Sequence, residues 1–279
     1  MKHLQEAPSM TPPRARTASS VAGPALAAGL ALCALLSTTA CSALSTPPTA
    51  RKPDYAPTTA APTPTKRAPA TPPGPAALTT AQAQAALVTE ADLGEPWMPT
   101  QGAATWHDGL LKATTDKPDC RRLLDTLYAE EPFGVDAPAR AVIGLDDLWN
   151  ESQLRYQVIT RPSAELDRTL AWLRTLPEKC ARFTATTGPG YVQGVQVVDA
   201  GLPEVGDARQ GLRVVLTGET PDGEPTVLTM DLAVVRVGDD ALGLTHGGLG
   251  EVSPEVTQAA VELGAQRLTD VRRTGRVQV

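Results

Sequence analysis

A tract of 36 residues, 41–76, contains ten prolines, and most of its other residues are alanine and threonine. Proline fixes one backbone dihedral and removes a hydrogen-bond donor, and the tract has almost no large apolar residues to bury. Such a composition cannot offset the entropy lost on folding, and it is typical of extended, semi-rigid spacers. The tract therefore divides the chain, and we expect one folded domain after it, over residues 77–279.

Residues 1–40 have the features of a secretory signal. They carry three basic groups and one acid, and the uncharged run VAGPALAAGLALCALL occupies residues 21–36. This run is short for a membrane-spanning helix, which needs about 20 apolar residues. The small residues STTA follow it and lead directly to Cys41. A basic segment, an apolar run and a small-residue cleavage site together predict a signal peptide.

The stretch TTAC resembles the lipobox of bacterial lipoproteins, where a small residue precedes a cysteine whose sulfur receives a diacylglyceryl group. Thr38 stands where that pattern prefers leucine. We predict a lipoprotein signal peptide over 1–40, acylation of Cys41 with palmitate as the expected fatty acid, and a tether over 41–76. The domain would then lie at the outer face of the cell membrane. Cleavage after Ala40 with plain secretion, or an uncleaved membrane anchor, are the alternatives.

The expected domain is acidic. Residues 77–279 have 18 lysines and arginines against 29 acidic residues, a formal charge of −11. Nucleic-acid-binding domains usually carry a basic stripe, and anionic membranes attract basic patches. The charge therefore argues against a nucleic-acid partner. The expected membrane contact is through the lipid on Cys41.

The four cysteines separate by position. Cys33 lies in the apolar run and would leave with the signal peptide, and Cys41 is the expected acylation site. Cys120 and Cys180 remain, in a domain expected to be exported to a compartment where disulfides persist. We predict that these two are bonded. Two free thiols or metal ligands are the alternatives, although no CxxC or close Cys/His spacing favours metal.

Apolar periodicity and capping residues predict four helices. Ser163 is a plausible cap for one of them. Ser253 followed by Pro254 is typical of another helix start. In the helix that follows, Gly264 indicates close packing against a neighbour. The helices are expected over residues 79–94, 118–129, 163–179 and 254–273.

Alternating or continuous apolar runs predict the strands, over 153–161, 191–200, 211–219, 225–238 and 241–248. The turn TPDG joins the third to the fourth, and a tight turn at residues 238–240 joins the fourth to the fifth. Short links force neighbouring strands to be antiparallel. The predicted fold class is therefore α+β: a twisted antiparallel sheet, a meander in its C-terminal half, helices packed on one side of it, and one disulfide.

This arrangement resembles the extracellular sensor domain of PknH-type mycobacterial Ser/Thr kinases and the actinobacterial envelope lipoproteins that share it. The resemblance covers most of residues 78–272 and is carried by LVTEADLG at 87–94, DC at 119–120, Cys180 and VVRVGDDAL at 234–242. It implies a non-enzymatic sensor with a cleft in a twisted antiparallel sheet. Kinase members of the family usually carry two disulfides, whereas one pair is expected here. Because kinase motifs are absent from the sequence, the resemblance implies a detached sensor module.

Motifs for known catalytic chemistry are missing from the sequence: it has no GxSxG elbow, P-loop, HExxH or EF-hand loop. We therefore expect neither catalysis nor a cofactor. His246 before two glycines is similar to an oxyanion-hole motif but is interpreted as a strand-end residue. His107 and Asp108 offer an acid/base pair, but neighbours on a strand would face opposite sides.

Three acids close in sequence, Asp146, Asp147 and Glu151, offer carboxylates for calcium. Their spacing fits no known calcium loop, so we interpret them as a solvated turn and expect no metal site.

The tryptophans give the remaining functional signal. Trp106 and Trp149 lie in polar stretches, and half-buried tryptophans often line binding clefts, although packing at a sheet edge is the alternative. A cleft, where present, is predicted near Trp106, His107, Trp149 and His246. The sequence thus predicts a lipid-anchored cell-surface sensor or ligand-binding module without catalysis, with a small molecule, cell-wall component or protein as ligand. An exported hydrolase with an unrecognised site, or a structural or partner-binding envelope protein, are the alternatives.

Overall fold

A computed structural model describes residues 77–134, 136–220 and 222–277. The predicted signal peptide, the acylation site Cys41 and the tether all lie outside the described residues. Inside them, no helix combines the length and the apolar character needed to span a bilayer.

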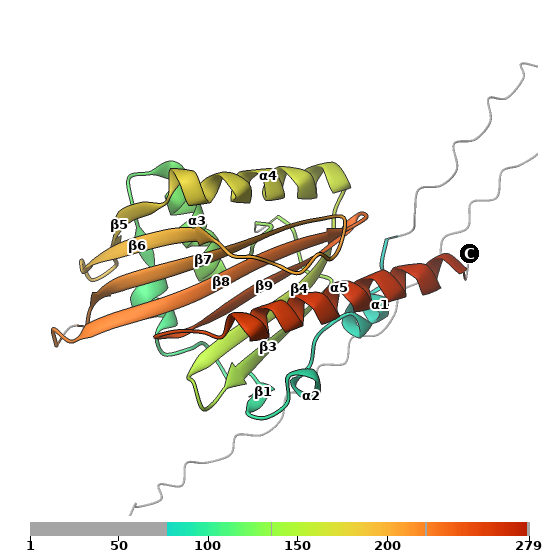
Figure 1. Cartoon of the computed structure of the whole chain (residues 1–279), viewed down its shortest axis with the longest axis horizontal. Coiled ribbons are helices and arrows are strands. Elements are labelled where there is room, and N and C mark those ends of the chain that lie inside the picture. Colours follow the sequence, from blue (N-terminus) through green and yellow to red (C-terminus); the bar gives the residue numbers. More distant parts are fainter. Residues whose placement is uncertain (1–76, 135, 221, 278–279) are drawn as a thin grey trace, which may run out of the picture. The chain divides into compact units, whose positions relative to one another are not determined.

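The described residues form one antiparallel sheet of nine strands, shown in Figure 1, in the order β1-β3-β4-β9-β8-β7-β6-β5-β2. Five strands consecutive in the chain are consecutive in the sheet, which confirms the predicted meander. They are β5 (Arg182–Thr187), β6 (Val192–Asp199), β7 (Ala208–Glu219), β8 (Pro225–Val237) and β9 (Asp240–Leu249).

The remaining strands extend the sheet on both sides of the meander. The predicted strand β4 (Ser152–Thr160) pairs with β9. Three others were not predicted: β3 (Ala141–Asp147) beside β4, and the short edge strands β1 (Trp97–Pro99) and β2 (Ala113–Thr114). The meander also gains β5, which the sequence analysis did not single out.

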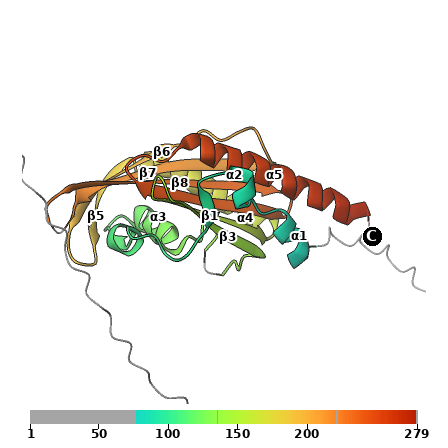
Figure 2. The ribbon, with the colours of Figure 1, turned by 90° about the horizontal axis from the view of Figure 1, so that it is seen from below.

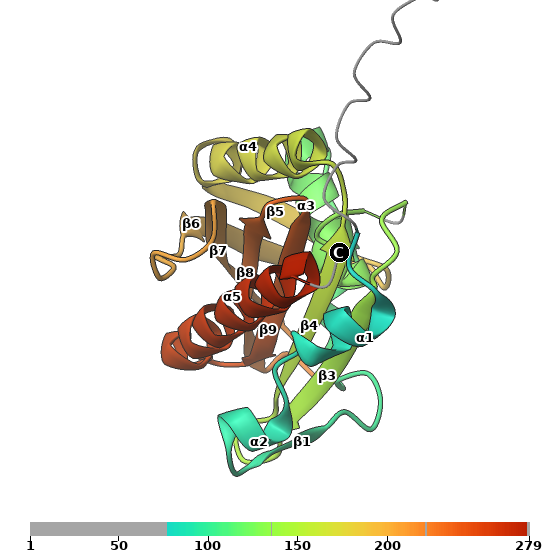
Figure 3. The same cartoon turned by 90° about the vertical axis from the view of Figure 1, so that its right-hand side faces the viewer.

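Helices lie on both faces of the sheet, which corrects the expectation of one covered side. In β8, Val234 packs in the cluster with α3 (Pro118–Ala129) and α4 (Ser163–Lys179). The next residue, Val235, packs in the cluster with α1 (Thr80–Ala85) and α5 (Pro254–Val277). Successive strand residues face opposite sides, so the two helix pairs sandwich the sheet. Figure 2 shows α5 and α3 on opposite sides, and Figure 3 shows β7 and β8 between α4 and α5.

Helices α3 and α4 have the predicted bounds, and α5 begins at the predicted Pro254. The predicted helix over 79–94 is instead two short helices, α1 and α2 (Glu90–Leu93). Thr89 interrupts it, because its backbone N–H and hydroxyl both donate to the Asp92 carboxylate at 2.8 Å and start a new helix. The expected cap of α4 was also wrong: Pro162 holds that position.

The predicted disulfide is present. Cys120, in the first turn of α3, is bonded to Cys180, at the end of α4, with an S–S distance of 2.08 Å. Both residues are buried, and the leucines of the two helices surround them in one core cluster. The bond therefore fastens the two helices that cover one face of the sheet.

Helix α5 packs closely on the other face, as Gly264 indicated. A Cβ atom at this position would lie 2.7 Å from Cε2 of Tyr156 on β4, so the glycine lets the aromatic ring reach the helix backbone. Farther along α5, Arg267 forms an ion pair with Asp92 at 2.6 Å. That pair holds the α1–α2 segment to the helix.

Candidate functional site

The structure does not bring the four predicted cleft residues together. Trp106 packs in the cluster on the α3 face, and His107 follows it in a π-helical turn, η1 (His107–Leu111). His246 faces the opposite side, where it contacts the ring of Trp97. Trp149 is 74% exposed in the β3–β4 turn. Trp106 and His246 thus lie on opposite faces of the sheet, because His246 and Gly247 alternate across β9 and Trp106 packs over the glycine.

The glycine after His246 has a packing role. A Cβ atom on Gly247 would lie 2.9 Å from Cη2 of Trp106. The missing side chain leaves room for the indole to lie against the sheet, where its Nε1 donates a hydrogen bond to the carbonyl of Glu151 at 3.3 Å. Packing thus accounts for the glycine that followed the histidine in the sequence motif.

An open groove of about 440 Å³ lies at the β3–β4 turn, with Trp106 in its wall. The loop after β1 forms one side, and the ends of β3 and β4 form the other. Leu148 lines the groove, although 62% of it is exposed, and the exposed Trp149 follows it in the chain. Large apolar side chains exposed beside a concave surface are typical of a binding site. The lining residues are 101–106, 146–148 and 151–153.

The acids of this groove do not converge on one point. The Asp146 carboxylate accepts hydrogen bonds from Thr100 and Gln153, both at 2.8 Å. The neighbouring Asp147, on the other face of β3, accepts from Asn150 Nδ2 at 2.7 Å and so caps the turn. Each carboxylate holds a loop in place. In the described ranges, no group of three His, Cys, Asp or Glu side chains is arranged to hold a metal ion.

Glu151 differs from the two aspartates. Its backbone is left-handed, with φ of 50°, and its carboxylate has no hydrogen-bond or ion-pair partner among the residues that the structure describes. It lines the groove together with Trp106 and Leu148. The groove therefore combines apolar walls with one free carboxylate.

His107 lies outside the groove, in a cluster with Asp108 and Tyr128. Its Nδ1 is 3.2 Å from the Asp108 carboxylate, which also accepts a hydrogen bond from the Tyr128 hydroxyl at 3.3 Å. From the sequence we expected a strand here, with the two side chains on opposite faces. The π-helical turn η1 lets adjacent side chains meet instead. These hydrogen bonds hold the pKa of Asp108 below its usual value.

His246 belongs to a buried hydrogen-bonded network under the first turn of α5. The Arg213 guanidinium binds both oxygens of Asp231, at 2.7 and 2.9 Å. The same carboxylate accepts the Thr257 hydroxyl proton at 2.9 Å. Because this hydroxyl donates to Asp231, it must accept from Nδ1 of His246, 3.0 Å away. The other ring nitrogen, Nε2, then accepts from Ser152 at 3.4 Å.

Burial lowers the pKa of His246 to about 4, so the ring is neutral near pH 7. The nearby Asp231 and Asp147 raise the pKa again, and Arg213 lowers it, each by less than burial does. The order serine, histidine, hydroxyl, aspartate is similar to a hydrolytic relay. The ring is only 1% exposed and both of its nitrogens are engaged, so we assign this network to packing α5 on the sheet.

The residues that organise this network were not predicted from the sequence. Asp231 is a charged residue in the otherwise apolar stretch VLTMDLAVV of β8, and such a residue needs a buried partner. That signal was available. The identities of the partners, Arg213 on β7 and Thr257 on α5, depend on the pairing of strands distant in the sequence.

Comparison with known proteins finds a likeness in structure but none in sequence. No family model and no curated protein matches the chain. The fold is similar to the crystal structure of the extracellular domain of PknH from Mycobacterium tuberculosis. The two share 16% sequence identity, with a TM-score of 0.42 over 72% of this chain and all of that one.

Proposed function

We propose that this protein is a ligand-binding module without catalytic activity, exported and tethered by a lipid on Cys41 to the outer face of the membrane. The open groove beside Trp106 is the proposed ligand site. The TTAC motif and the apolar run before it support export and acylation. The buried Cys120–Cys180 bond supports a non-cytosolic compartment, since disulfides persist where the environment is oxidising.

The position of the groove carries this proposal. Ala77, the first described residue, lines a cavity with Thr160, at the C-terminal end of β4. The groove adjoins Ser152, at the other end of the same strand. Nine residues of extended strand separate these ends by about 27 Å. The groove therefore lies at the opposite end of β4 from Ala77, where the proposed tether joins the domain, which would leave it accessible to ligands.

The groove favours an amphipathic ligand. Trp106, Leu148 and the adjacent Trp149 offer apolar and aromatic surface. The carboxylate of Glu151 offers the polar contact, since Asp146 and Asp147 are held by chain donors. A ligand with an apolar body and a donor or cationic group matches this lining.

Replacing Trp149 by alanine is expected to weaken ligand binding about tenfold, as for an exposed aromatic anchor. The free energy of unfolding should change by no more than about 0.5 kcal/mol, because the side chain is mostly exposed. Thermal-shift screening of the Cys41→Ser protein against amphipathic amines and cell-wall fragments would find the ligand. Titration of that ligand against the variant would give the change in affinity.

Tyr191→Ala is the matched control, since it removes an exposed aromatic side chain from the β5–β6 turn, whereas Trp149 lies in the β3–β4 turn that forms the groove. It should leave the affinity unchanged. Equal loss of binding in both variants, or none in Trp149→Ala, would place the ligand elsewhere and reject the groove.

A further inference from the structure

Strand β7 has an open edge. Its neighbour β6 pairs with it only from Leu212 onward, opposite Asp199, while β7 itself begins four residues earlier, at Ala208. The last backbone hydrogen bond across this edge runs from the N–H of Ala200 to the carbonyl of Gly211, at 3.1 Å. After Ala200 the chain leaves the sheet, so no residue that the structure describes continues β6 along residues 208–210.

The backbone N–H and C=O of Arg209 point toward this open edge. In an antiparallel strand, residues two apart direct their backbone groups to the same side, so the backbone groups of Arg209 point in the same direction as those of Gly211. The β8–β9 ladder leads to the same assignment. The Gly250 N–H donates to the Val227 carbonyl at 2.8 Å, so the backbone groups of odd-numbered β8 residues point toward β9. The backbone groups of even-numbered β8 residues therefore point toward β7, where they pair with even-numbered residues. The odd-numbered β7 residues, Arg209 among them, face the other way. Among the described residues, no group forms a hydrogen bond with the backbone N–H or C=O of Arg209.

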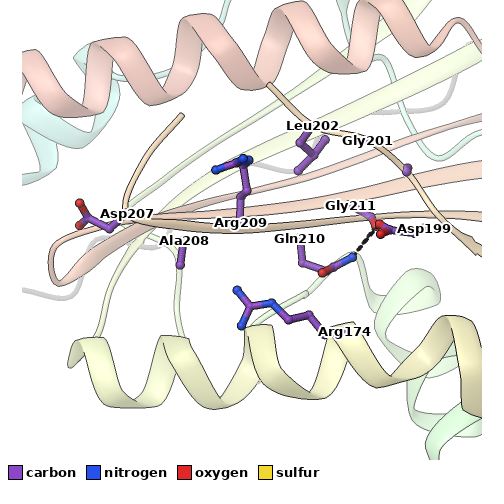
Figure 4. A pocket seen from close by; sticks show the side chains of 10 residues that line it. Arg174, Asp199, Gly201, Leu202, Asp207, Ala208, Arg209, Gln210 and Gly211 are labelled. Atoms are coloured by element: carbon purple, nitrogen blue, oxygen red, sulfur yellow. Dashed lines mark hydrogen bonds between the residues drawn. The ribbon is translucent and has the colours of Figure 1, made fainter. Parts of the chain in front are cut away.

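A cavity of about 410 Å³ lies along this edge, and Figure 4 shows its side chains. Three of its four charged residues have partners. The Arg209 guanidinium pairs with Glu204, Asp199 accepts from Gln210 at 2.9 Å, and Asp207 accepts the Gly238 N–H at 2.6 Å.

Arg174, on α4, is the fourth charged residue of this cavity. Its side chain extends from the helix toward the strand edge in Figure 4. It forms no ion pair or hydrogen bond with any residue in the described ranges. The cavity thus presents a free guanidinium next to a free backbone donor and acceptor.

We propose that this edge binds a short extended peptide with a free carboxyl terminus. The peptide main chain would add to β7 by exchanging hydrogen bonds with the N–H and C=O of Arg209, as in other cases of strand addition. Its terminal carboxylate would contact Arg174, whose planar donors match a carboxylate. The cavity offers one unpaired guanidinium, and the domain around it has a charge of −11, which favours a single carboxylate over an acidic tract. This site is separate from the Trp106 groove.

The first test measures fluorescence polarisation of the Cys41→Ser protein with labelled tetrapeptides, as free acids and as C-terminal amides. We expect saturable binding of free acids and about tenfold weaker binding of their amides. Arg174→Ala should weaken free-acid binding about tenfold and abolish the difference between acid and amide. Arg168→Ala, which removes the same charge from an exposed position on the same helix but outside this cavity, should do neither. Absence of saturable binding, or equal effects of both variants, would overturn the proposal.

The second test separates the backbone of Arg209 from its side chain. Arg209→Ala keeps the N–H, whereas Arg209→Pro removes it. Proline is tolerated where a strand N–H faces outward, so the two variants should have similar melting temperatures. Peptide affinity should fall about tenfold from Arg209→Ala to Arg209→Pro. A large loss of stability in the proline variant would show that the edge is already paired, and equal affinities would show that the peptide does not bind there; either result contradicts strand addition.

Discussion

Replacing both Cys120 and Cys180 by alanine is expected to lower the free energy of unfolding by about 4 kcal/mol. The bond closes a loop with a sequence separation of 60. In the chain-entropy model, a bond across a loop of this length reduces the conformational entropy of the unfolded chain and so stabilises the fold by about 4 kcal/mol. It also joins α3 to α4, whose buried leucines cover one face of the sheet. Urea unfolding of the two proteins, followed by circular dichroism, measures the difference.

Reduced wild-type protein is the matched control for this comparison. Both cysteines are buried, so reduction must be carried out on the unfolded chain before refolding with a thiol reductant present. The reduced wild type should unfold at a urea concentration near that of the double variant. A difference below about 1 kcal/mol between oxidised and reduced protein would show that the helices are held by packing alone.

Acid is expected to destabilise the domain through His246, by up to about 3 kcal/mol between pH 6.5 and pH 4. The folded protein keeps this ring neutral until about pH 4, whereas the ring in the unfolded chain is protonated near pH 6.5. Over this interval the unfolded state binds more protons. The histidine contribution to stability is therefore complete above pH 6.5, falls as the pH drops below that value, and is lost below about pH 4.

Comparing His246→Gln with the wild type isolates this contribution from the carboxylates that titrate in the same range. The variant is expected to be less stable at pH 7, because Thr257 and Ser152 lose their ring partner. Its stability should also depend less steeply on pH between 6.5 and 4. Equal slopes in wild type and His246→Gln would show that the ring titrates normally in the fold.

The C-terminal half of the fold was predictable because its signals are local. Ser253 and Pro254 marked the start of α5, and short turns fixed the antiparallel meander. The burial of the sheet on both faces could also have been predicted, although we expected one covered side. Most of residues 226–235 in β8 form a long, mainly apolar run, which is typical of a strand covered on both faces. Edge strand β1 is three residues long and carries too little pattern to recognise.

The candidate site was less predictable, because it depends on which residues face the same side. Trp106 and His246 are both buried, but alternation along β9 separates them, and sequence distance alone does not reveal this. The sequence drew attention to Trp149 as a tryptophan in a polar stretch and to Glu151 as a carboxylate for calcium. Both adjoin the groove because the β3–β4 turn folds back beside Trp106. The open edge at Arg209 has no local signal at all, since it arises where β6 ends.

Native mass spectrometry of the protein extracted from its own membrane tests the central proposal most directly. We expect a chain that begins at Cys41 and is heavier by a diacylglyceryl group and a fatty acid. We also expect a bound ligand that collisional activation releases without breaking covalent bonds. A chain with a different first residue and no lipid would contradict the anchor. An acylated chain that never carries or acquires a dissociable ligand would contradict the binding function.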